Sequence, residues 1–355
     1  MGGKGMKAAR LHAIGDFRVD EVQTPVPRGR ELLVRVGGCG ICGSDIPRIF
    51  ELGTSKQQYP LTIGHELGGT VVAVGEEADK SLIGKRGAVF PLIPCRKCAP
   101  CLSANYAMCE DYDYLGSRSD GGFAQFCIVP SAWHFVESKN PATSMDALGM
   151  VEPCTVAQHA VRKSNLRAGY SVLILGAGPI GIMAARWARL FGAEPVALVD
   201  VVEEKAAFAR ARGEIVFNSK TQDVAEEFEK LNGGSLADVV IEGTGIAVGQ
   251  AADLAKPFGT VVLLGNPHRD TVVALKQHSN ILRKELLLTG VWNSHFAATP
   301  VNEWTYTVSM LDAGKMRVED LITHRASLDE LPGLCRDIYE RRVTICKAVY
   351  SAEQK

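Results

Sequence analysis

The amino-acid sequence predicts a two-domain α/β protein, made of a β-rich domain and a doubly wound parallel sheet. Its 355 residues exceed what one typical hydrophobic core holds, which favours two domains. In the first part of the chain, short apolar runs are separated by glycine and proline turns, as in β-rich domains. From about residue 170 the apolar runs alternate with helix-forming segments, which is the spacing of strands and helices in a parallel sheet.

The composition is that of a globular protein with no extended charged surface. Hydrophobic residues make up 46% of the chain, and 39 basic residues nearly balance 40 acidic ones. This balance argues against nucleic acid and anionic membranes as partners. No apolar run reaches the roughly 18 residues of a membrane span, and the start lacks a secretory signal. We therefore expect a cytoplasmic protein whose ten cysteines serve metal binding rather than disulfides.

A glycine-rich turn between a buried strand and a helix marks the start of the parallel sheet. The apolar run Val172–Leu175 is followed by the letters G-A-G-P-I-G and then by good helix formers. Gly176 allows a tight turn, Gly178 lets the backbone approach a pyrophosphate, and Gly181 lets the helix pack close to the strand. The helix N-terminus offers its amides and positive dipole end to the phosphates. The predicted cofactor-binding residues of this turn are Gly176, Gly178, Pro179, Ile180 and Gly181.

An acidic residue ends the next predicted strand. The run Val196–Val199 leads into Asp200, which lies 22 residues beyond Gly178. A carboxylate at this point can hold both hydroxyls of an adenosine ribose, and it repels the 2′-phosphate of NADP. No arginine follows directly to neutralise such a phosphate, because Val201 and Val202 come next. We therefore predict that the cofactor is NAD.

Apolar runs give the predicted strands of both domains. Helix-compatible segments at 221–231 and 246–256 lie between the later runs. In the β-rich domain the predicted strands are 32–36, 69–74, 86–90 and 123–129. In the parallel sheet they are 172–175, 196–199, 215–217, 239–242, 261–264 and 286–289, the number that a complete doubly wound sheet needs.

The tail of the chain is expected to return to the first domain, because the six-stranded sheet is complete without it. Two helices, at 301–313 and 328–340, and a final strand at 347–350 are predicted in this tail. The predicted domain boundaries are 6–155 together with 296–355 for the β-rich domain, and 156–295 for the dinucleotide-binding domain.

Four cysteines lie close together in the first domain, spaced C-x2-C-x2-C-x7-C. They are Cys95, Cys98, Cys101 and Cys109. Four thiolates at this spacing favour a closed, structural zinc site. Bacterial iron–sulfur proteins share the first three positions, but their fourth cysteine follows after three residues and precedes a proline. Two disulfides are the other alternative, which a reducing compartment disfavours.

A second metal site is predicted from three short motifs that are far apart in the sequence. Cys42 lies in G-I-C-G-S-D, His65 in G-H-E and Glu152 in V-E-P. A thiolate, an imidazole and a carboxylate leave a fourth position open, which is typical of catalytic zinc. Each residue alone also fits a structural role, as a small buried hydrophobe, a core histidine or a helix-capping acid.

The motifs in this order resemble the zinc-dependent medium-chain dehydrogenase/reductase family over essentially the whole chain. The resemblance implies a GroES-like catalytic domain, a Rossmann domain and two zinc ions per subunit. It implies catalytic zinc on Cys42, His65 and Glu152, with Glu66 as an alternate ligand, and Cys154 is the rival to Glu152. A glutamate at the third position is similar to the polyol dehydrogenase branch. A homodimer or homotetramer is also expected.

The resemblance implies the oxidation of a polyol or polyol phosphate by NAD. Zinc lowers the pKa of a secondary hydroxyl, and the cofactor accepts the hydride. Ser44, two residues past Cys42, is expected to accept the hydroxyl proton, and its alternative role is that of a plain turn residue. A non-catalytic nucleotide-binding protein would lack the ligands, and a zinc-free quinone reductase would lack the four cysteines and G-H-E.

Arginine side chains are the candidates for binding a substrate phosphate, because a guanidinium fork suits a phosphate dianion. Arg48 lies six residues after Cys42, within reach of a substrate at the metal. Its alternative role is to pair with Glu51 or to remain solvated. Arg118 is a second candidate and Lys284 a third.

Overall fold

The computed structural model describes residues 5–297 and 302–352, and the chain divides into two compact units. The first unit ends at Pro153 and resumes at His295, and the second runs Cys154–Ser294. In the part of the chain that the structure describes, no helix is long and apolar enough to cross a membrane.

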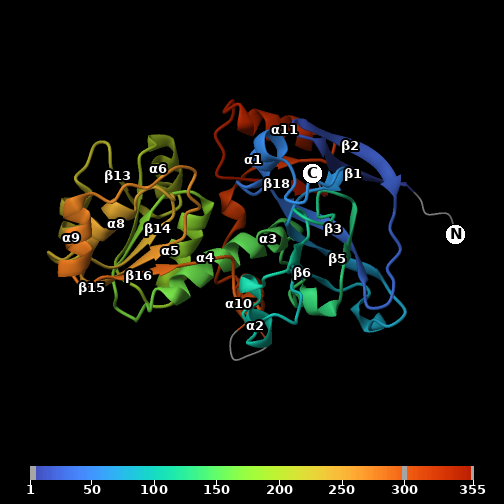
Figure 1. Cartoon of the computed structure of the whole chain (residues 1–355), viewed down its shortest axis with the longest axis horizontal. Helices are drawn as coiled ribbons and strands as arrows, with labels where there is room; N and C mark the ends of the chain where they lie inside the picture. The colour runs from blue at the N-terminus through green and yellow to red at the C-terminus, as the bar shows by residue number, and fades with distance from the viewer. Residues whose placement is uncertain (1–4, 298–301, 353–355) are drawn as a thin grey trace. The chain divides into compact units, whose positions relative to one another are not determined.

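The main sheet of the first unit gathers strands from the beginning, middle and end of the chain (Figure 1). The four strands predicted for this domain all belong to it. Its order is β10 (Phe135–Glu137), β6 (Arg86–Val89), β5 (Glu66–Val74), β3 (Leu32–Gly40), β18 (Lys347–Ser351) and β17 (Ile322–Ala326), and β9 (Phe126–Val129) also pairs with β3.

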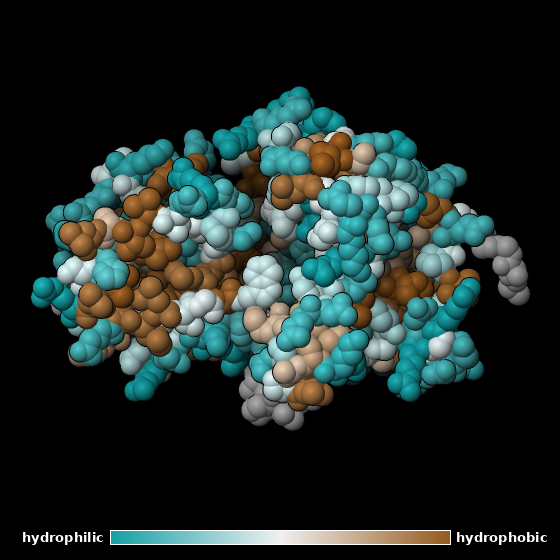
Figure 2. Space-filling view, in the orientation of Figure 1, coloured by the Kyte–Doolittle hydropathy of each residue, from teal (hydrophilic) through white to brown (hydrophobic). Residues whose placement is uncertain are grey.

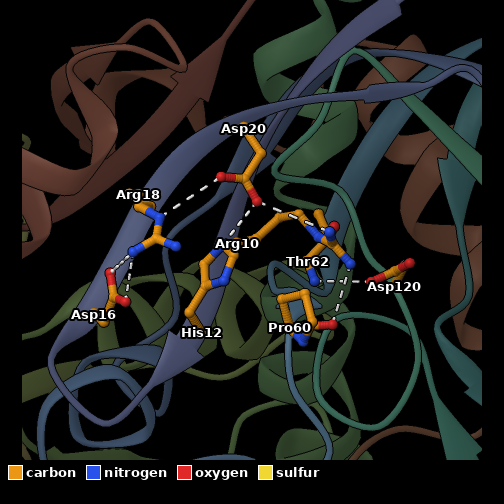
Figure 3. Close-up of polar contacts among 8 residues, drawn as sticks. All are labelled: Arg10, His12, Asp16, Arg18, Asp20, Pro60, Thr62 and Asp120. Atoms are coloured by element: carbon orange, nitrogen blue, oxygen red, sulfur yellow. Dashed lines mark hydrogen bonds and ion pairs between the residues drawn. The ribbon is translucent and has the colours of Figure 1, made fainter.

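A smaller sheet in the first unit contains strands that the sequence did not reveal. Its order is β2 (Asp16–Gln23), β1 (Gly5–Ala13) and β4 (Leu61–Thr62). Charged residues interrupt the apolar ones in β1 and β2, and β4 has only two residues, so no continuous apolar run marks these strands. Figure 3 shows polar side chains of this sheet in contact: His12 Nε2 lies 2.7 Å from Asp20 Oδ2, and Arg10 donates to the carbonyl of Pro60.

The tail joins the first unit through its last strand. β18 pairs antiparallel with β3, where Val349 lies opposite Gly40, and parallel with β17. All five residues of β18 are buried, so this strand completes the core. The tail helices are α10 (Glu303–Asp312) and α11 (Leu331–Tyr339), and Val301, where the first was predicted to start, lies outside the described residues.

The second unit contains a six-stranded parallel sheet, which confirms the predicted doubly wound fold. Each of the six predicted apolar runs contributes to one strand, because strands covered on both faces are apolar throughout; the edge strand β16 is apolar but partly exposed. The order is β13 (Ile215–Asn218), β12 (Val196–Asp200), β11 (Val172–Leu175), β14 (Ala237–Glu242), β15 (Ala255–Leu263) and β16 (Leu287–Gly290).

Helices connect these strands, and local chemistry fixes their ends. α7 (Val224–Leu231) begins later than predicted because Asp223 caps it, accepting the amides of Ala225 and Glu226. α8 (Val248–Leu254) ends early because Ala255 already begins β15. The other helices are α4 (Val151–Lys163), α5 (Pro179–Leu190), α6 (Glu203–Arg210) and α9 (Leu275–Arg283), and α4 leads from the first unit into the second.

Candidate active site and cofactor site

Three of the predicted metal-binding side chains meet in the first unit. Donor atoms of Cys42, His65 and Glu66 all lie within 4.8 Å of one another. Strand pairing explains this meeting, because Gly40, at the end of β3, lies opposite Glu66, at the start of β5. Cys42 follows the first of these strands directly, and His65 precedes the second. Two motifs that are separate in the sequence therefore converge at one end of a strand pair.

A buried carboxylate, Asp45, organises this cluster. One of its oxygens accepts the Cys42 amide at 3.0 Å, and the other accepts Arg48 Nη1 at 2.7 Å. The second oxygen also lies 3.4 Å from His65 Nδ1. Burial alone would raise the pKa of Asp45, but His65, Arg48 and the Cys42 amide lower it overall. The carboxylate thus stays charged and orients the histidine, a role that the sequence analysis did not assign.

His65 is surrounded by acidic side chains. Burial lowers the pKa of His65, yet the charges of Asp45 and Cys42 outweigh burial and raise it well above its ordinary value. An electron-rich cluster of thiolate, imidazole and carboxylate suits a divalent cation such as Zn²⁺. The donor chemistry therefore fits the metal that the sequence implies.

Glu152 lies beside this cluster, in the first turn of α4. Tyr114 donates its hydroxyl to Glu152 Oε1 at 3.3 Å. Burial raises the pKa of Glu152 to about 7, and the nearby Glu66 carboxylate adds to the rise. Among the described residues, the group of donors within 4.8 Å of one another contains Glu66 and not Glu152. Two carboxylates are thus available for one metal position.

The rival ligand Cys154 belongs to the second unit and is packed as a hydrophobic residue. Its side chain is fully buried, and its carbonyl accepts Trp187 Nε1 at 2.9 Å. Burial raises the pKa of the Cys154 thiol to about 12. Among the described residues, the group of donors within 4.8 Å of one another that contains Cys42 and His65 does not include Cys154.

The remaining candidates around the substrate take different positions. Ser44 is exposed and directly precedes the short helix α1 (Asp45–Pro47), without capping it through its side chain. Arg48 is largely buried and pairs with Asp45 rather than with Glu51. Arg118 lies over the ring of Tyr112 at 3.9 Å.

Lys284 has a structural role, which corrects its place among the phosphate-binding candidates. Its ammonium group donates to the carbonyls of Ala252, Asp253 and Ala255 at 3.2, 2.8 and 2.7 Å. These carbonyls close α8 and begin β15, so Lys284 satisfies acceptors that the end of the helix leaves without partners.

The four predicted cysteines of the other site also come together. Donor atoms of Cys95, Cys98, Cys101 and Cys109 lie within 4.8 Å of one another, and all four thiols are free. Amide donors at Lys97 and Cys98 lower the pKa of Cys95 to about 6, which favours its thiolate. Within the first unit, this loop contacts Trp133 through Arg96, whose guanidinium carbon lies 4.5 Å from the centre of the Trp133 ring. The four-sulfur donor set fits a tetrahedral zinc ion.

The glycine turn of the second unit has the geometry expected for a dinucleotide. Gly176 has a φ of +108°, and a Cβ at Gly181 would lie 2.0 Å from the Gly176 carbonyl. A Cβ at Gly178 would meet no described atom within 4 Å, which leaves room for a phosphate at the start of α5. The Asp200 carboxylate accepts hydrogen bonds from the backbone amides of Ala177 and Val202, both at 2.9 Å. The bond to Ala177 fixes the glycine turn next to this carboxylate.

The fold and the two donor sets define a zinc-binding dehydrogenase with GroES-like and Rossmann-type domains. Residues 28–139 match the alcohol dehydrogenase GroES-like domain, and residues 179–312 match the zinc-binding dehydrogenase domain. The chain therefore belongs to the zinc-binding alcohol dehydrogenase family.

Individual relatives lie in the same family. Galactitol 1-phosphate 5-dehydrogenase of Escherichia coli K12 is 34% identical over 94% of this chain and 96% of its own length. A crystal structure of galactitol-1-phosphate dehydrogenase from E. coli matches with a TM-score of 0.89 at 33% identity, covering 98% of this chain and all of that one. A putative zinc-binding dehydrogenase from Sinorhizobium meliloti 1021, bound to NADP, matches with a TM-score of 0.87 at 31% identity over 98% and 99%.

The two donor sets should respond differently to the loss of a thiol. Cys42→Ser should lower turnover at least about 100-fold, because the reacting hydroxyl loses its Lewis acid, while the melting temperature stays close to that of the wild type. Cys98→Ser should lower the melting temperature by more than about 5 °C, because structural zinc contributes to folding. Turnover, zinc content and thermal unfolding test both expectations.

Cys154→Ala serves as the control for the catalytic ligands. We expect Glu152→Ala to remove far more activity than Cys154→Ala. A larger loss of activity in Cys154→Ala than in Glu152→Ala would show that Cys154, and not Glu152, is the ligand.

Proposed function

We propose that this enzyme oxidises a secondary hydroxyl of a polyol phosphate to a ketone, with NAD as the hydride acceptor. Galactitol 1-phosphate is the substrate that we favour, which would place the enzyme in galactitol metabolism. The observation that carries the proposal is the cluster of Cys42 and His65 with two carboxylates, because a carboxylate in the third ligand position distinguishes polyol dehydrogenases from the simple-alcohol branch. The similarity to galactitol 1-phosphate 5-dehydrogenase supports the same substrate class.

The catalytic zinc would be held by Cys42, His65 and Glu152, with Glu66 as an alternate ligand. When bound, zinc supplies the Lewis-acid chemistry that lowers the pKa of an alcohol. Asp45 prepares the histidine for this role, because its carboxylate faces Nδ1 and leaves Nε2 for the metal. Ser44 is exposed next to Cys42, where its hydroxyl is suited to accept the substrate proton and pass it to solvent.

A second zinc ion would be held by the four-cysteine site and would have a structural role. Four protein ligands leave no position for a substrate. None of the ten cysteines, all of which lie in the described residues, forms a disulfide. Because free thiols persist in a reducing compartment, we place the enzyme in the cytoplasm.

The preference for NAD is proposed from Asp200 and its neighbours. We expect catalytic efficiency with NAD to exceed that with NADP at least about tenfold, or roughly 1.4 kcal/mol, because the carboxylate repels a 2′-phosphate. Steady-state kinetics with both cofactors measure the preference. Val201 is half exposed and offers a matched variant. Val201→Arg should lower the ratio of catalytic efficiency with NAD to that with NADP, because the arginine would neutralise the 2′-phosphate of NADP. Equal efficiency of the wild type with both cofactors would contradict the proposal.

The substrate phosphate is proposed to bind Arg48 and Arg118. Arg48 uses Nη1 for Asp45, and its fork has further N–H donors for phosphate oxygens. Arg118 donates one Nη1 hydrogen to the Tyr112 carbonyl and is held flat by the ring of that residue. Both side chains are therefore fixed in direction before a ligand arrives, which lowers the entropy cost of binding.

Arginine variants test substrate class directly. Arg118→Leu should lower kcat/KM for galactitol 1-phosphate by roughly 10–100-fold, the range for one charged hydrogen bond, and leave galactitol almost unaffected. Arg48→Leu should reduce turnover of both compounds, because Asp45 also loses its partner, with the larger loss for the phosphate ester. Reduced cofactor is measured with galactitol 1-phosphate, galactitol, sorbitol and xylitol. A wild type that prefers sorbitol or xylitol would favour the non-phosphorylated alternative instead.

The enzyme is proposed to form a homodimer or homotetramer through the edge of the parallel sheet. β16 is the last strand in the sheet, and Leu287 on it is 48% exposed. Phe258, Leu275 and Leu282 are exposed on neighbouring segments. Figure 2 shows hydrophobic residues gathered on the face where Figure 1 draws α9, β15 and β16. An uncharged edge strand in such a patch is a template for pairing with a second copy.

The edge strand can be altered without breaking its pairing to β15. The Val291 amide donates to Leu263, so by alternation the Leu288 amide points to the free edge. Leu287→Lys and Leu288→Pro should each yield smaller particles in size-exclusion chromatography with light scattering. Ile14→Lys, on the exposed β1–β2 turn, is the control and should leave the mass unchanged. A wild type that is monomeric at micromolar concentration would rule out this interface.

A further inference from the structure

An aromatic cluster in the first unit is centred on Trp133. Its ring meets the rings of Phe90, Phe296 and Tyr106 edge-on, with centroids 5.6, 4.7 and 5.2 Å away. Phe296 in turn stacks on Phe90, with centroids 4.3 Å apart. Edge-to-face contact is an arrangement that aromatic rings prefer, because the positive edge of one ring faces the negative face of the other. The cluster therefore fixes the orientation of its rings, and Trp133 contacts each of the other three.

Two contacts of Trp133 come from the four-cysteine loop. The Arg96 guanidinium carbon lies 4.5 Å from the centre of the Trp133 ring. Arg96 follows the first cysteine of the loop, and Tyr106 lies between the last two. Arg96 has a φ of +60°, a left-handed conformation that residues other than glycine seldom adopt. Such a conformation persists only where the surrounding structure holds it, so the place of Arg96 over the ring depends on the fold of this loop.

On its other side, Trp133 contacts the segment by which the chain returns from the second unit. This segment, residues 291–297, directly follows β16 and contains Phe296. At its start the Val291 amide donates to the Leu263 carbonyl at 3.0 Å. Near its end the His295 amide donates to Glu303 Oε2 at 2.6 Å, and this carboxylate belongs to a buried residue. The segment is therefore fastened at both ends.

The same segment begins at the edge of the parallel sheet where a dinucleotide is expected. β16 runs parallel to β15, β15 to β14, and β14 to β11. Their carboxyl ends therefore lie at one edge, which is also the edge of the glycine turn that follows β11. Dinucleotides bind outside the carboxyl ends of such strands. The residues that follow β16, among them Trp292 with 56% of its surface exposed, lie at this cofactor edge.

We infer that Trp133 is a positioning residue for the cofactor: it connects the four-cysteine loop with Phe296, and so fixes the segment 291–297 at the cofactor edge. The inference rests on the proposed dinucleotide site and needs no assumption about the substrate. It gives the four-cysteine loop a part in cofactor affinity, beyond its part in stability. A tryptophan that only filled the core would affect stability alone.

The test is Trp133→Leu in the zinc-loaded enzyme. The dissociation constant of NADH, measured by the fluorescence of the bound nicotinamide, should rise at least about fivefold, because a segment that is no longer fixed must be ordered on binding. Amide hydrogen exchange in residues 291–297 should become at least about fivefold faster. The KM for NAD should rise while kcat at saturating NAD does not fall, since the lost interaction is a binding one. Unchanged NADH affinity or unchanged exchange would overturn the inference.

Two milder variants keep the test decisive if Trp133→Leu folds poorly. Trp133→Phe keeps an aromatic ring against Phe296, and it should keep NADH affinity within about twofold of the wild type. Arg96→Met removes the cation above the ring and leaves the core filled. It should weaken NADH binding by about twofold or more, in the same direction as Trp133→Leu. Wild-type affinity in Arg96→Met, or a loss in Trp133→Phe as large as that in Trp133→Leu, would contradict the inference.

Phe17→Leu is the control for a general loss of stability. Phe17 is buried in the main core of the first unit, where its ring lies 6.4 Å from that of Phe123. This variant should lower the melting temperature but change neither NADH affinity nor exchange in residues 291–297. If it weakened NADH binding as much as Trp133→Leu, the effect would be one of stability and the inference would be wrong.

A double variant tests whether the loop acts through Trp133. Cys98→Ser alone should also weaken NADH binding, because the loop that holds Arg96 loses one of its four thiols. The double variant C98S/W133L should bind NADH within about twofold of Trp133→Leu, since both changes break the same connection. Losses that multiply in the double variant would show two independent effects and refute the connection.

The failure of the proposed cofactor site would appear separately. Wild-type protein should bind NADH in the same fluorescence titration. If it bound neither NADH nor NADPH, the dinucleotide site itself would be wrong. If the wild type bound NADH and Trp133→Leu bound it equally well, the cofactor site would stand and the role of Trp133 would not.

Discussion

The antiparallel pairing of β3 with β5 and β18 is the constraint on which the proposed metal site depends. It sets Gly40 opposite Glu66 on one side and opposite Val349 on the other. Cys42 and Lys347 lie just beyond these pairs, and His65 precedes its strand by one residue. A shift of one residue in either register would turn alternate side chains to the other face of the sheet and separate the donors. Backbone hydrogen bonds thus position the chemistry.

Buried charges at this site are stable only as a set. Asp45 and Glu66 are anions that water barely reaches, and each lies against a cation, Arg48 and Lys347 respectively. Removing one partner from such a pair leaves the other charge uncompensated, which costs more than the pair contributes. The cluster also offers a dication a thiol and carboxyl groups, which bind a metal in their deprotonated forms.

Sequence patterns revealed the parts of the protein in which a single requirement, such as burial on both faces of a strand, determines the residue types. The parallel strands were predictable because burial on both faces requires continuous apolar runs, as in Val172–Leu175. β1 and β2 were not, because their charged residues interrupt the apolar ones and leave no continuous apolar run to mark a strand. Cys42 and His65 stood out through short motifs, whereas Asp45 and Lys347 act through pairing across the fold. Only the single charge in an otherwise apolar final run could have pointed to Lys347 before the structure.

The return of the tail has a consequence for how the site forms. Lys347 and Ile41 are 306 residues apart in the sequence and are joined by a hydrogen bond. The segment that carries Cys42, His65 and Glu66 receives the cation that pairs with Glu66 only from β18, at the other end of the chain. Contacts between residues so far apart in the sequence form late in folding. The chain must first lose the entropy of closing the long intervening loop, and only then do these contacts stabilise it. The second unit is inserted into that loop, so its folding shortens the path and helps the tail to complete the site.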